Sequence, residues 1–437
     1  MTFELVCLDP AASQDLGRMY YQLTTKDGSV TLRAMLTNSA GHLLSLGKIS
    51  GSTFAIVQRK AFKALRCSLN NLTAESNTTL DGKMSSNSHH MPLPSLDDDT
   101  IVGSLLLIGD EIIQPDDNYG VARVQYLTQG TYTLMLERHR YFECQCGCVH
   151  PSRMDPHYKL DSPLFQSVVL SLAWTDIMSC VPCASIPILD KKYWLEDAVK
   201  ACQESARQLR PQNDLGYCAQ LLSLLGDCET AVHNLFTESA SEEDFIHIQL
   251  DLDLRLDEAM SQLPSPVNPR TNTPPNVDTQ TDCLIEADRT DPAEAHNVCI
   301  TAAICHGLAT RIFLLRATDH TSDSPRIKAL CYRLLQCLGQ VSLDHSVVTI
   351  MLWPIWVLGC ESPVDDGANS WRDFVTGFLR AVYQRQRMKN VEKCLVTLEE
   401  QIWSLEPTSL GQTCEDRPQQ SAWVRHCWDK KIKLLFA

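Results

Sequence analysis

The segment that decides the fold is Val347–Cys360, which reads VVTIMLWPIWVLGC. Apolar side chains would occupy every face of a helix with this sequence, which is typical of a helix buried on all sides. Its fourteen residues are too few to cross a bilayer, which takes about 20 residues. Trp353 and Trp356 add bulk that only a large core can enclose. The segment therefore predicts a central core helix.

Local signals predict where this helix begins, bends and ends. Asp344 or Ser346 can cap its first turn, because both side chains offer an oxygen to unpaired backbone N–H groups. Pro354 removes one backbone donor and is expected to kink the helix near its middle. Gly359 and Pro363 are typical of positions at which a helix stops.

Helical periodicity extends along the whole chain. Apolar residues recur at intervals of three and four in the C-terminal ranges 298–313, 327–341, 371–383 and 391–402. Earlier helices are expected within 33–47, 54–72, 98–141, 163–180, 214–237 and 245–263. No block alternates apolar and polar residues as a half-buried strand would. The sequence therefore predicts an all-α fold, built as a multi-helix array.

Two long polar insertions interrupt the helices. Residues 73–97 have few large apolar side chains, and residues 264–292 are rich in Pro, Asn, Thr and Asp. Segments of this composition cannot bury enough apolar surface to offset the entropy lost on ordering. We expect a single helical domain over residues 1–437, with flexible insertions at 73–97 and 264–292.

Charge and hydropathy exclude some classes of protein. The net charge is −15, whereas a domain that mainly grips phosphate is usually basic. The most basic helix carries Arg59, Lys60, Lys63 and Arg66 between apolar residues, a pattern more typical of a solvated face than of a nucleic-acid face. The mean hydropathy is −0.15, no apolar run is expected to span a bilayer, and the N-terminus lacks a signal-peptide pattern. We expect an intracellular protein without a membrane partner.

Nineteen cysteines raise the hypothesis of a metal site. Most are scattered singly through helical patterns, as small, buried, reduced residues are in intracellular chains. One cluster is denser and contains Cys144, Cys146, Cys148 and His150. Its alternating cysteines lack the paired C-x2-C knuckles that let sulfur atoms converge on zinc. We therefore expect no bound metal.

Motifs of common enzymes are absent from the sequence. It contains no G-x-x-x-x-G-K-[ST], no G-x-G-x-x-G after a strand, no G-x-S-x-G and no H-E-x-x-H. His306 lies on an apolar helix face, which is more typical of a hydrogen-bonded core histidine than of a general base. Asp251, Asp253 and Asp257 are expected to form a solvated helix face. The sequence therefore predicts no catalytic residue, no cofactor and no enzyme activity.

Residues 343–403 contain recognisable sequence motifs in addition to their helical periodicity. The stretches TIMLWPIWVLGCES, WRDFVTGFL (371–379) and NVEKCLVTLEEQIW (390–403) resemble the C-terminal half of the regulatory domain of fungus-specific transcription factors. The residues that match the motifs of that family are Trp353, Pro354, Gly359, Cys360, Glu361, Arg372 and Trp403.

Other stretches resemble the same family in the same order, so that the resemblance covers nearly the whole chain. LAWTDIMSCVPCASIPIL (172–189) is similar to a helix and proline segment of the family through Trp174, Asp176 and Ser179. Further similar stretches are RAMLTNSAGHL (33–43), YLTQGTYTLM (126–135), LLGDCETAVHNL (224–235), AICHGLATRIFLLR (303–316) and SAWVRHCWDKKIKLLF (421–436).

The sequence departs from the family in its cysteines. Such factors usually begin with a binuclear zinc cluster of six cysteines, which holds two zinc ions and reads DNA. Cys7 and Cys67 are solitary, and the CQCGC stretch does not have the spacing of that cluster. Direct DNA contact by this chain is therefore not expected. Three explanations stay open, namely a truncated gene model, a diverged paralogue, or a cofactor that pairs with an intact factor.

The resemblance implies a regulator of transcription in the nucleus. Its helical body would bind a protein partner or a small effector and so modulate a metabolic or secondary-metabolite pathway. The partner would be a DNA-binding transcription factor or a second copy in a homo-oligomer. The alternative is a non-catalytic cytoplasmic helical scaffold, and nuclear import separates the two hypotheses.

Overall fold

Regular structure is entirely helical in the computed structural model, which describes residues 10–81, 98–114, 120–143, 163–208, 217–266, 292–321, 324–362, 370–405 and 422–436. The expected all-α fold is confirmed. The first helices are α1 (Pro10–Thr24), α2 (Val30–Ser45), α3 (Gly51–Asp81), α4 (Asp98–Ile113), α5 (Gly120–Glu143), α6 (Pro163–Met178) and α7 (Leu195–Gln208). The remaining ones are α8 (Ala219–Phe236), α9 (Glu242–Ser261), α10 (Pro292–Arg316), α11 (Pro325–Leu338), α12 (Leu352–Cys360), α13 (Trp371–Gln386), α14 (Lys389–Thr397) and α15 (Trp423–Lys430).

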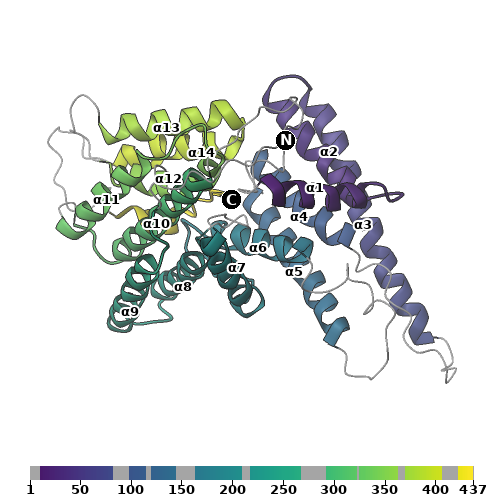
Figure 1. Ribbon diagram of the computed structural model, residues 1–437, viewed down its shortest axis with the longest axis horizontal. Coiled ribbons are helices and arrows are strands. Elements are labelled where there is room, and N and C mark those ends of the chain that lie inside the picture. The colour runs from purple at the N-terminus through teal and green to yellow at the C-terminus, as the bar shows by residue number, and fades with distance from the viewer. Residues whose placement is uncertain are drawn as a thin grey trace, which may run out of the picture.

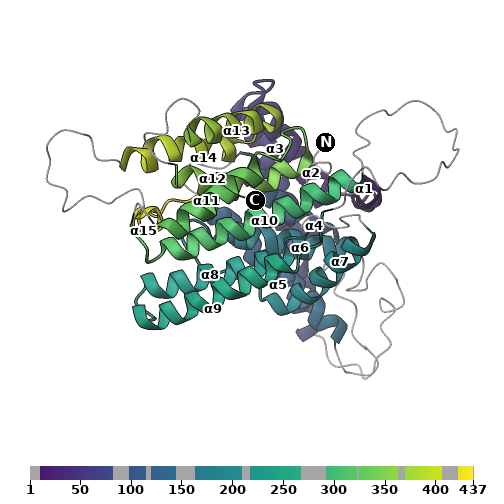
Figure 2. The same cartoon turned by 60° about the vertical axis from the view of Figure 1, so that its left-hand side comes forward.

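Helix α10 is the centre of the C-terminal half. It contacts α8, α9, α11, α12 and α15, and it runs between these helices in Figure 2. Helices α2, α3 and α4 form a second group of neighbours, at the right of Figure 1. Because α6 contacts both α4 and α8, it links the two groups.

The central apolar segment is a 3₁₀ turn, Ser346–Met351, followed by α12, in which every residue is buried. The Nδ1 atom of His345 caps this turn by accepting a hydrogen bond from the backbone N–H of Val347 at 3.1 Å. Because the turn begins at Ser346, the capping position is the residue before it. The expected caps, Asp344 and Ser346, are therefore wrong.

Pro354 does not interrupt the middle of a helix. It lies in the first turn of α12, where backbone N–H groups have no partner inside the helix in any case. The absence of an N–H group at Pro354 therefore removes no hydrogen bond from the helix. The expected mid-helix kink is wrong, because the sequence pattern did not show that the α-helix begins only at Leu352.

Gly359 allows a close approach between two segments. The helix ends at Cys360, near the expected stop, while Pro363 lies outside the described residues. A Cβ atom at Gly359 would lie 2.7 Å from Cδ1 of Leu398. The indole N–H of Trp403 donates a hydrogen bond to the Gly359 carbonyl oxygen at 2.8 Å. Glycine is required here because the segment after α14 packs directly on the α12 backbone.

An aromatic cluster joins α12 to the end of the chain. Trp353 and Trp356 stack with ring centroids 6.0 Å apart, and Trp423 lies edge-on to Trp356 at 5.3 Å. Phe436 and Phe313 meet Trp353 edge-on at 5.3 and 5.7 Å. All five rings are fully buried, and such aromatic pairs each add about 0.5–1.5 kcal/mol beyond their buried area. The C-terminal segment is therefore part of the core.

The first expected insertion is shorter than the sequence suggested. Helix α3 continues to Asp81, so residues 73–81 are helical. Residues 82–97 and 267–291 lie outside the described residues. The single domain over 1–437 and the flexibility of these two segments stay predictions.

One helix in the described part of the chain is long and apolar enough to cross a membrane, contrary to the expectation from the sequence. It is the stretch Ala293–Arg316 of α10, with a mean hydropathy of 1.8. However, 83% of the apolar window is buried inside the protein. Its apolar character is therefore explained by its central position in the core.

We expect the substitution Gly359→Ala to destabilise the protein by about 1–3 kcal/mol, because the added methyl group overpacks against Leu398 and Val375. The matched control is Gly377→Ala in α13, where a Cβ atom meets nothing within 4 Å. The control should be neutral or stabilising by about 0.5–1 kcal/mol. Urea unfolding followed by circular dichroism measures both variants, and equal stabilities would contradict the packing role.

Candidate functional site

The Glu361 side chain, directly after α12, is a meeting point of three distant segments. Its carboxylate oxygens accept hydrogen bonds from the Arg316 guanidinium at 2.8 and 2.7 Å, and Oε1 also accepts from the indole N–H of Trp423 at 2.8 Å. Arg316 further donates to the carbonyl oxygens of Asp319 and Thr321 at 3.0 and 2.7 Å. The Arg316 and Glu361 side chains are only 3% and 6% exposed. Glu361 therefore joins α10, α12 and α15 through one buried, well-satisfied ion pair.

The other motif residues pack around the same end of α12. The Arg372 guanidinium lies over the ring of Trp403 at 5.0 Å and donates to the Ser362 carbonyl oxygen at 3.3 Å. Trp403 is in turn hydrogen-bonded to Gly359. The structure thus brings together the residues on which the family resemblance was based. Their contacts hold helices together, and this explains the motif as a packing signature.

Asp176 belongs to the stretch 172–189 that resembles the family, and it holds the proline-containing part of that stretch in place. The Asp176 carboxylate, at the end of α6, accepts hydrogen bonds from the backbone N–H groups of Ile188 and Leu189 at 2.7 and 2.6 Å. Burial raises the pKa of Asp176 to about 6, although these two hydrogen bonds oppose the shift. Trp174 packs edge-on against His306 at 5.3 Å. Asp176 therefore folds the segment before α7 back onto α6.

His306 is a core histidine, as expected. Its Nε2 atom is hydrogen-bonded to the Ile350 carbonyl oxygen at 2.8 Å. Burial lowers the pKa of His306 to about 4, partly offset by this hydrogen bond. The imidazole is therefore neutral at physiological pH, and it ties α10 to the turn before α12.

The expected solvated face of α9 is wrong for one of its three aspartates. Asp251 and Asp257 are exposed, but Asp253 is buried. Arg311 of α10 donates hydrogen bonds to Asp253 at 2.9 and 3.2 Å and to Asp257 at 2.7 Å, and Arg326 also pairs with Asp253. Asp253 lies on the side of α9 that faces α10, which helical periodicity alone did not reveal.

Sequence reasoning missed Glu229, which is fully buried in α8. Neither of its carboxyl oxygens has a hydrogen-bond partner among the described residues. Burial, and then the nearby Asp176 carboxyl group, raise the pKa of Glu229 well above its usual range. Burial therefore favours the uncharged acid form of this side chain. The only available signal was an acidic residue within a largely apolar helix, and α8 also contains Asp227.

No group of three or more His, Cys, Asp and Glu side chains is placed to hold a metal ion in the part of the chain that the structure describes. The cluster singled out in the sequence lies outside these residues and comprises Cys144, Cys146, Cys148 and His150. The absence of a metal there stays a prediction.

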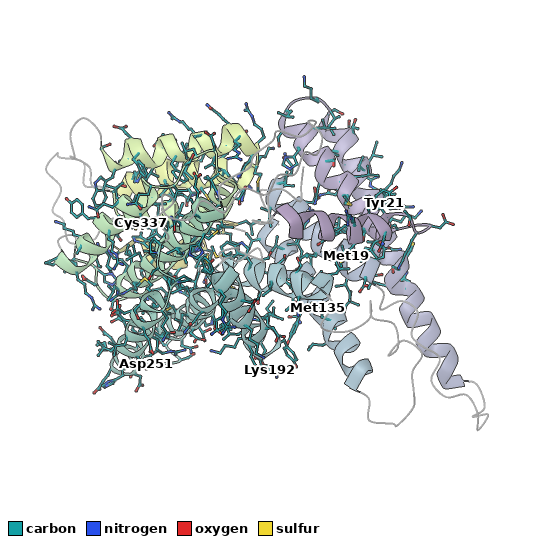
Figure 3. All side chains as sticks on the ribbon, in the orientation of Figure 1. Met19, Tyr21, Met135, Lys192, Asp251 and Cys337 are labelled. Atoms are coloured by element: carbon teal, nitrogen blue, oxygen red, sulfur yellow. The ribbon has the colours of Figure 1, made fainter. Side chains whose placement is uncertain are left out.

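Cys337 of α11 is labelled in Figure 3, and its thiol differs from those of the buried cysteines in and just before α8. A hydrogen bond from Cys305, opposed in part by burial, lowers the pKa of the Cys337 thiol to about 7. Burial instead raises the pKa of Cys218 and Cys228 well above the ordinary value. The Cys337 thiol is therefore easier to ionise than these two buried thiols.

The N-terminal helices build a surface feature that the sequence did not indicate. The Asp99 carboxylate of α4 accepts hydrogen bonds from the backbone N–H groups of Val30 and Thr31 at 2.8 and 3.0 Å, and from the Ser29 hydroxyl at 2.7 Å. Ser29 Oγ itself accepts from the Leu32 N–H at 3.0 Å. Because a negative charge stabilises a helix N-terminus, Asp99 fixes the start of α2 on α4.

Close packing and one partly buried hydrogen bond then set the positions of α2 and α3. A Cβ atom at Gly103 would lie 2.5 Å from Cγ1 of Val30, so α2 crosses directly over the α4 backbone. The Gln58 amide of α3 donates to the Asp110 carboxylate of α4 at 2.7 Å. Burial raises the pKa of Asp110 to about 7, against the effect of this hydrogen bond. Helices α2 and α3 are thus both fastened to α4.

A groove of about 1000 Å³ lies between α2 and α3. Its α2 wall exposes Leu32 and Leu36 by 40% and 54%. Its α3 wall carries the exposed residues Lys60 and Lys63. Further charged residues that line the groove are Lys26, Asp27 and Arg33. Exposed apolar surface bordered by charge is typical of a protein interface. We call this feature the α2–α3 groove.

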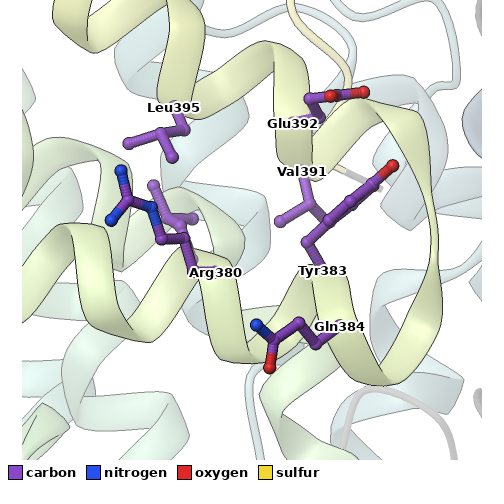
Figure 4. Close-up of a pocket in the computed structure, with 7 residues that line it drawn as sticks. Arg380, Tyr383, Gln384, Val391, Glu392 and Leu395 are labelled. Carbon is purple, nitrogen blue, oxygen red and sulfur yellow. The ribbon is translucent and has the colours of Figure 1, made fainter.

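A second hollow, of about 210 Å³, lies between α13 and α14. Figure 4 shows the residues that line it, which include Arg380, Tyr383, Gln384, Val391, Glu392 and Leu395. Pockets for small molecules usually measure about 300–1,000 Å³. This hollow is too small to enclose such a ligand, so the α2–α3 groove is the stronger candidate for a binding site.

The family model for the fungal specific transcription factor domain matches residues 3–437. The chain belongs to that family. Neither the curated proteins nor the solved structures contain a significant match to the chain.

Membership of the fungal specific transcription factor domain family shows a role in regulating transcription. The family consists of transcription factors rather than enzymes, and a nuclear location is typical of it. The geometry agrees with such a role, because the motif residues hold helices together while the α2–α3 groove remains open at the surface.

We expect the substitution Arg316→Met to destabilise this domain by about 3–5 kcal/mol, because it leaves the Glu361 charge buried without its counter-ion. Lys200→Met is the control, since Lys200 pairs with Glu196 on an exposed surface, where such pairs contribute less than about 1 kcal/mol. Chemical denaturation at neutral pH measures both. An Arg316→Met variant as stable as the control would show that Glu361 does not organise the core.

Proposed function

We propose that this chain regulates genes of a metabolic or secondary-metabolite pathway through protein contacts, and that a partner supplies the contact with DNA. The observation that carries the proposal is the family match over residues 3–437. The helical body acts as the regulatory part, and the α2–α3 groove is a surface through which it contacts another protein chain.

The chemistry of the α2–α3 groove supports a protein partner. Leu32 and Leu36 expose aliphatic surface to water, and burying it against a partner would contribute about 25 cal/mol for each Å² covered. Lys60 and Lys63 would attract acidic side chains and orient the partner. An amphipathic helix with acids along one edge matches both walls of the groove.

Three features support weak DNA binding by residues 1–437 alone. The net charge is −15, so an approaching duplex meets repulsion from most of the surface. The groove that holds Lys60 and Lys63 also exposes Leu32 and Leu36, and such apolar surface does not match a phosphate backbone. Gln58, which directly precedes Arg59 and Lys60 in α3, donates its amide hydrogen to the buried Asp110 and is not free to contact DNA.

The proposed place of action is the nucleus, as is typical of the family. The buried carboxylates of Glu361 and Asp176 accept hydrogen bonds from the Arg316 side chain and the Ile188 backbone, and these contacts hold the fold together. They support the proposal that the chain is a regulator without catalytic activity. Retention of a fluorescent fusion outside the nucleus would favour the alternative of a cytoplasmic scaffold.

A tethering assay tests the proposed function. Residues 1–437 are fused to an unrelated DNA-binding domain and brought to a reporter gene in fungal cells. We expect reporter output to change at least about threefold, and the change to shrink when Lys60 and Lys63 are both replaced by glutamate. The matched control replaces Lys192 and Lys200 by glutamate, and these two lysines are each 64% exposed. Reporter output equal to that of the DNA-binding domain alone would contradict the proposal.

A DNA titration tests the need for a partner. We expect purified residues 1–437 to bind duplex DNA weakly in an anisotropy assay at about 0.15 M salt, near physiological ionic strength. The reason is that nonspecific affinity requires a cluster of cations that releases counter-ions, which a chain of net charge −15 disfavours. Sequence-specific binding in the nanomolar range, typical of true readers, would overturn this prediction.

A further inference from the structure

Helix α9 exposes apolar side chains on the face that points away from the core. Its buried face, which includes Phe245, Leu252 and Leu256, packs inward. On the outer face Leu250 and Leu254 are exposed by 52% and 70%. A helix with apolar residues on both faces usually has partners on both. Within the described part of the chain, no helix covers this outer face, so α9 is half-partnered.

Acidic side chains border the exposed leucines of α9. Asp251 and Glu258 are seven residues apart and therefore lie along the same side of α9, and Glu258 lies one turn beyond Leu254. Asp251 is 67% exposed, and its pairing with Arg255 at 3.4 Å is at the surface. Figure 3 shows Asp251 at the outer edge of the molecule. The outer face of α9 is therefore a short amphipathic stripe with acids along one edge.

The α2–α3 groove has the complementary composition. It offers Leu32 and Leu36 on one wall and Lys60 and Lys63 on the other. Leu32 and Leu36 are four residues apart and Lys60 and Lys63 are three apart, so each wall presents about one helical turn of these side chains. An acidic amphipathic helix can place its leucines on the α2 wall and its carboxylates near the α3 lysines.

The two complementary surfaces cannot meet within one molecule. Figure 1 places α9 at the lower left and the α2–α3 pair at the right, at opposite ends of the longest axis. The contact must therefore form between two molecules. Because the stripe and the groove are different surfaces, the contact is heterologous, and the rotation between neighbouring copies decides whether it closes into a ring or continues along a chain of molecules.

We propose that this protein self-associates by docking the outer face of α9 from one copy into the α2–α3 groove of a second copy. The proposal assigns a second copy of the chain to the α2–α3 groove and rests on the protein-contact function given above for its biological role. The partner that contacts DNA then binds elsewhere on the assembly. The association itself is a property of the purified chain and is tested without any reporter gene.

Reciprocal charge reversal is the test. Sedimentation velocity at micromolar concentrations compares wild type, the groove variant Lys60→Glu with Lys63→Glu, the helix variant Asp251→Lys with Glu258→Lys, and a 1:1 mixture of the two variants. Wild type should associate. Each variant alone should lose association by at least about tenfold in Kd, because like charges then face each other. The mixture should recover it, because the reversed helix matches the reversed groove.

Two controls separate docking from changes in net charge or folding. Lys192→Glu with Lys200→Glu makes the same charge change as the groove variant at exposed sites, and it should associate like wild type. Leu254→Ser removes an aliphatic group that is 70% exposed, so the fold should persist while association weakens. Circular dichroism verifies the helical content of each variant.

Several results would overturn the proposal. They are a wild type that stays monomeric up to about 0.1 mM, an unchanged association of either charge variant or of Leu254→Ser, and a mixture of well-folded variants that does not re-associate. If a charge variant fails to fold, Leu254→Ser alone decides. A failed tethering assay with intact self-association would reject the proposed function and leave the docking contact standing.

Discussion

The core depends on a carboxylate that has been taken out of water. Glu361 is 6% exposed, and such a charge is tolerated only if nearby donors replace its hydration. Those donors are Arg316, at the end of α10, and Trp423, at the start of α15. Their geometry fixes the relative positions of α10, α12 and α15. The aromatic cluster of Trp353, Trp356 and Phe436 then packs into the space that this arrangement encloses.

A second carboxylate plays the corresponding role in the N-terminal helices. Asp99 offers its oxygens to the first turn of α2, and Gly103 lets α2 lie directly on α4. Because Gln58 fastens α3 to the same helix, α2 and α3 stand next to each other with their outer sides exposed. The groove between them is thus a consequence of how α4 holds both helices, and it concentrates positive charge on a chain of net charge −15.

A regulatory domain acts through exposed surfaces that contact other molecules. In this chain the exposed apolar surfaces are formed by other residues than those whose buried contacts join the helices. The motif residues that mark the family, such as Trp403 and Arg372, are used to join helices. The exposed leucines of α2 and α9 lie away from those junctions. Substitutions on the surfaces can therefore change partners without disturbing the buried ion pair. This separation is a physical reason why one helical scaffold can serve regulators with different partners.

The sequence by itself determined the helical class, the central apolar segment and the family motifs, because apolar spacing and local residue order are properties of neighbouring positions. Only the tertiary structure decided that Pro354 lies in a first turn, that Gly359 meets Leu398, and that Asp253 is buried against α10. It also decided that Leu250 and Leu254 stay exposed, although their spacing matches that of core residues. The reason is that periodicity assigns faces to a helix, whereas the packing of distant helices decides which of those faces is covered.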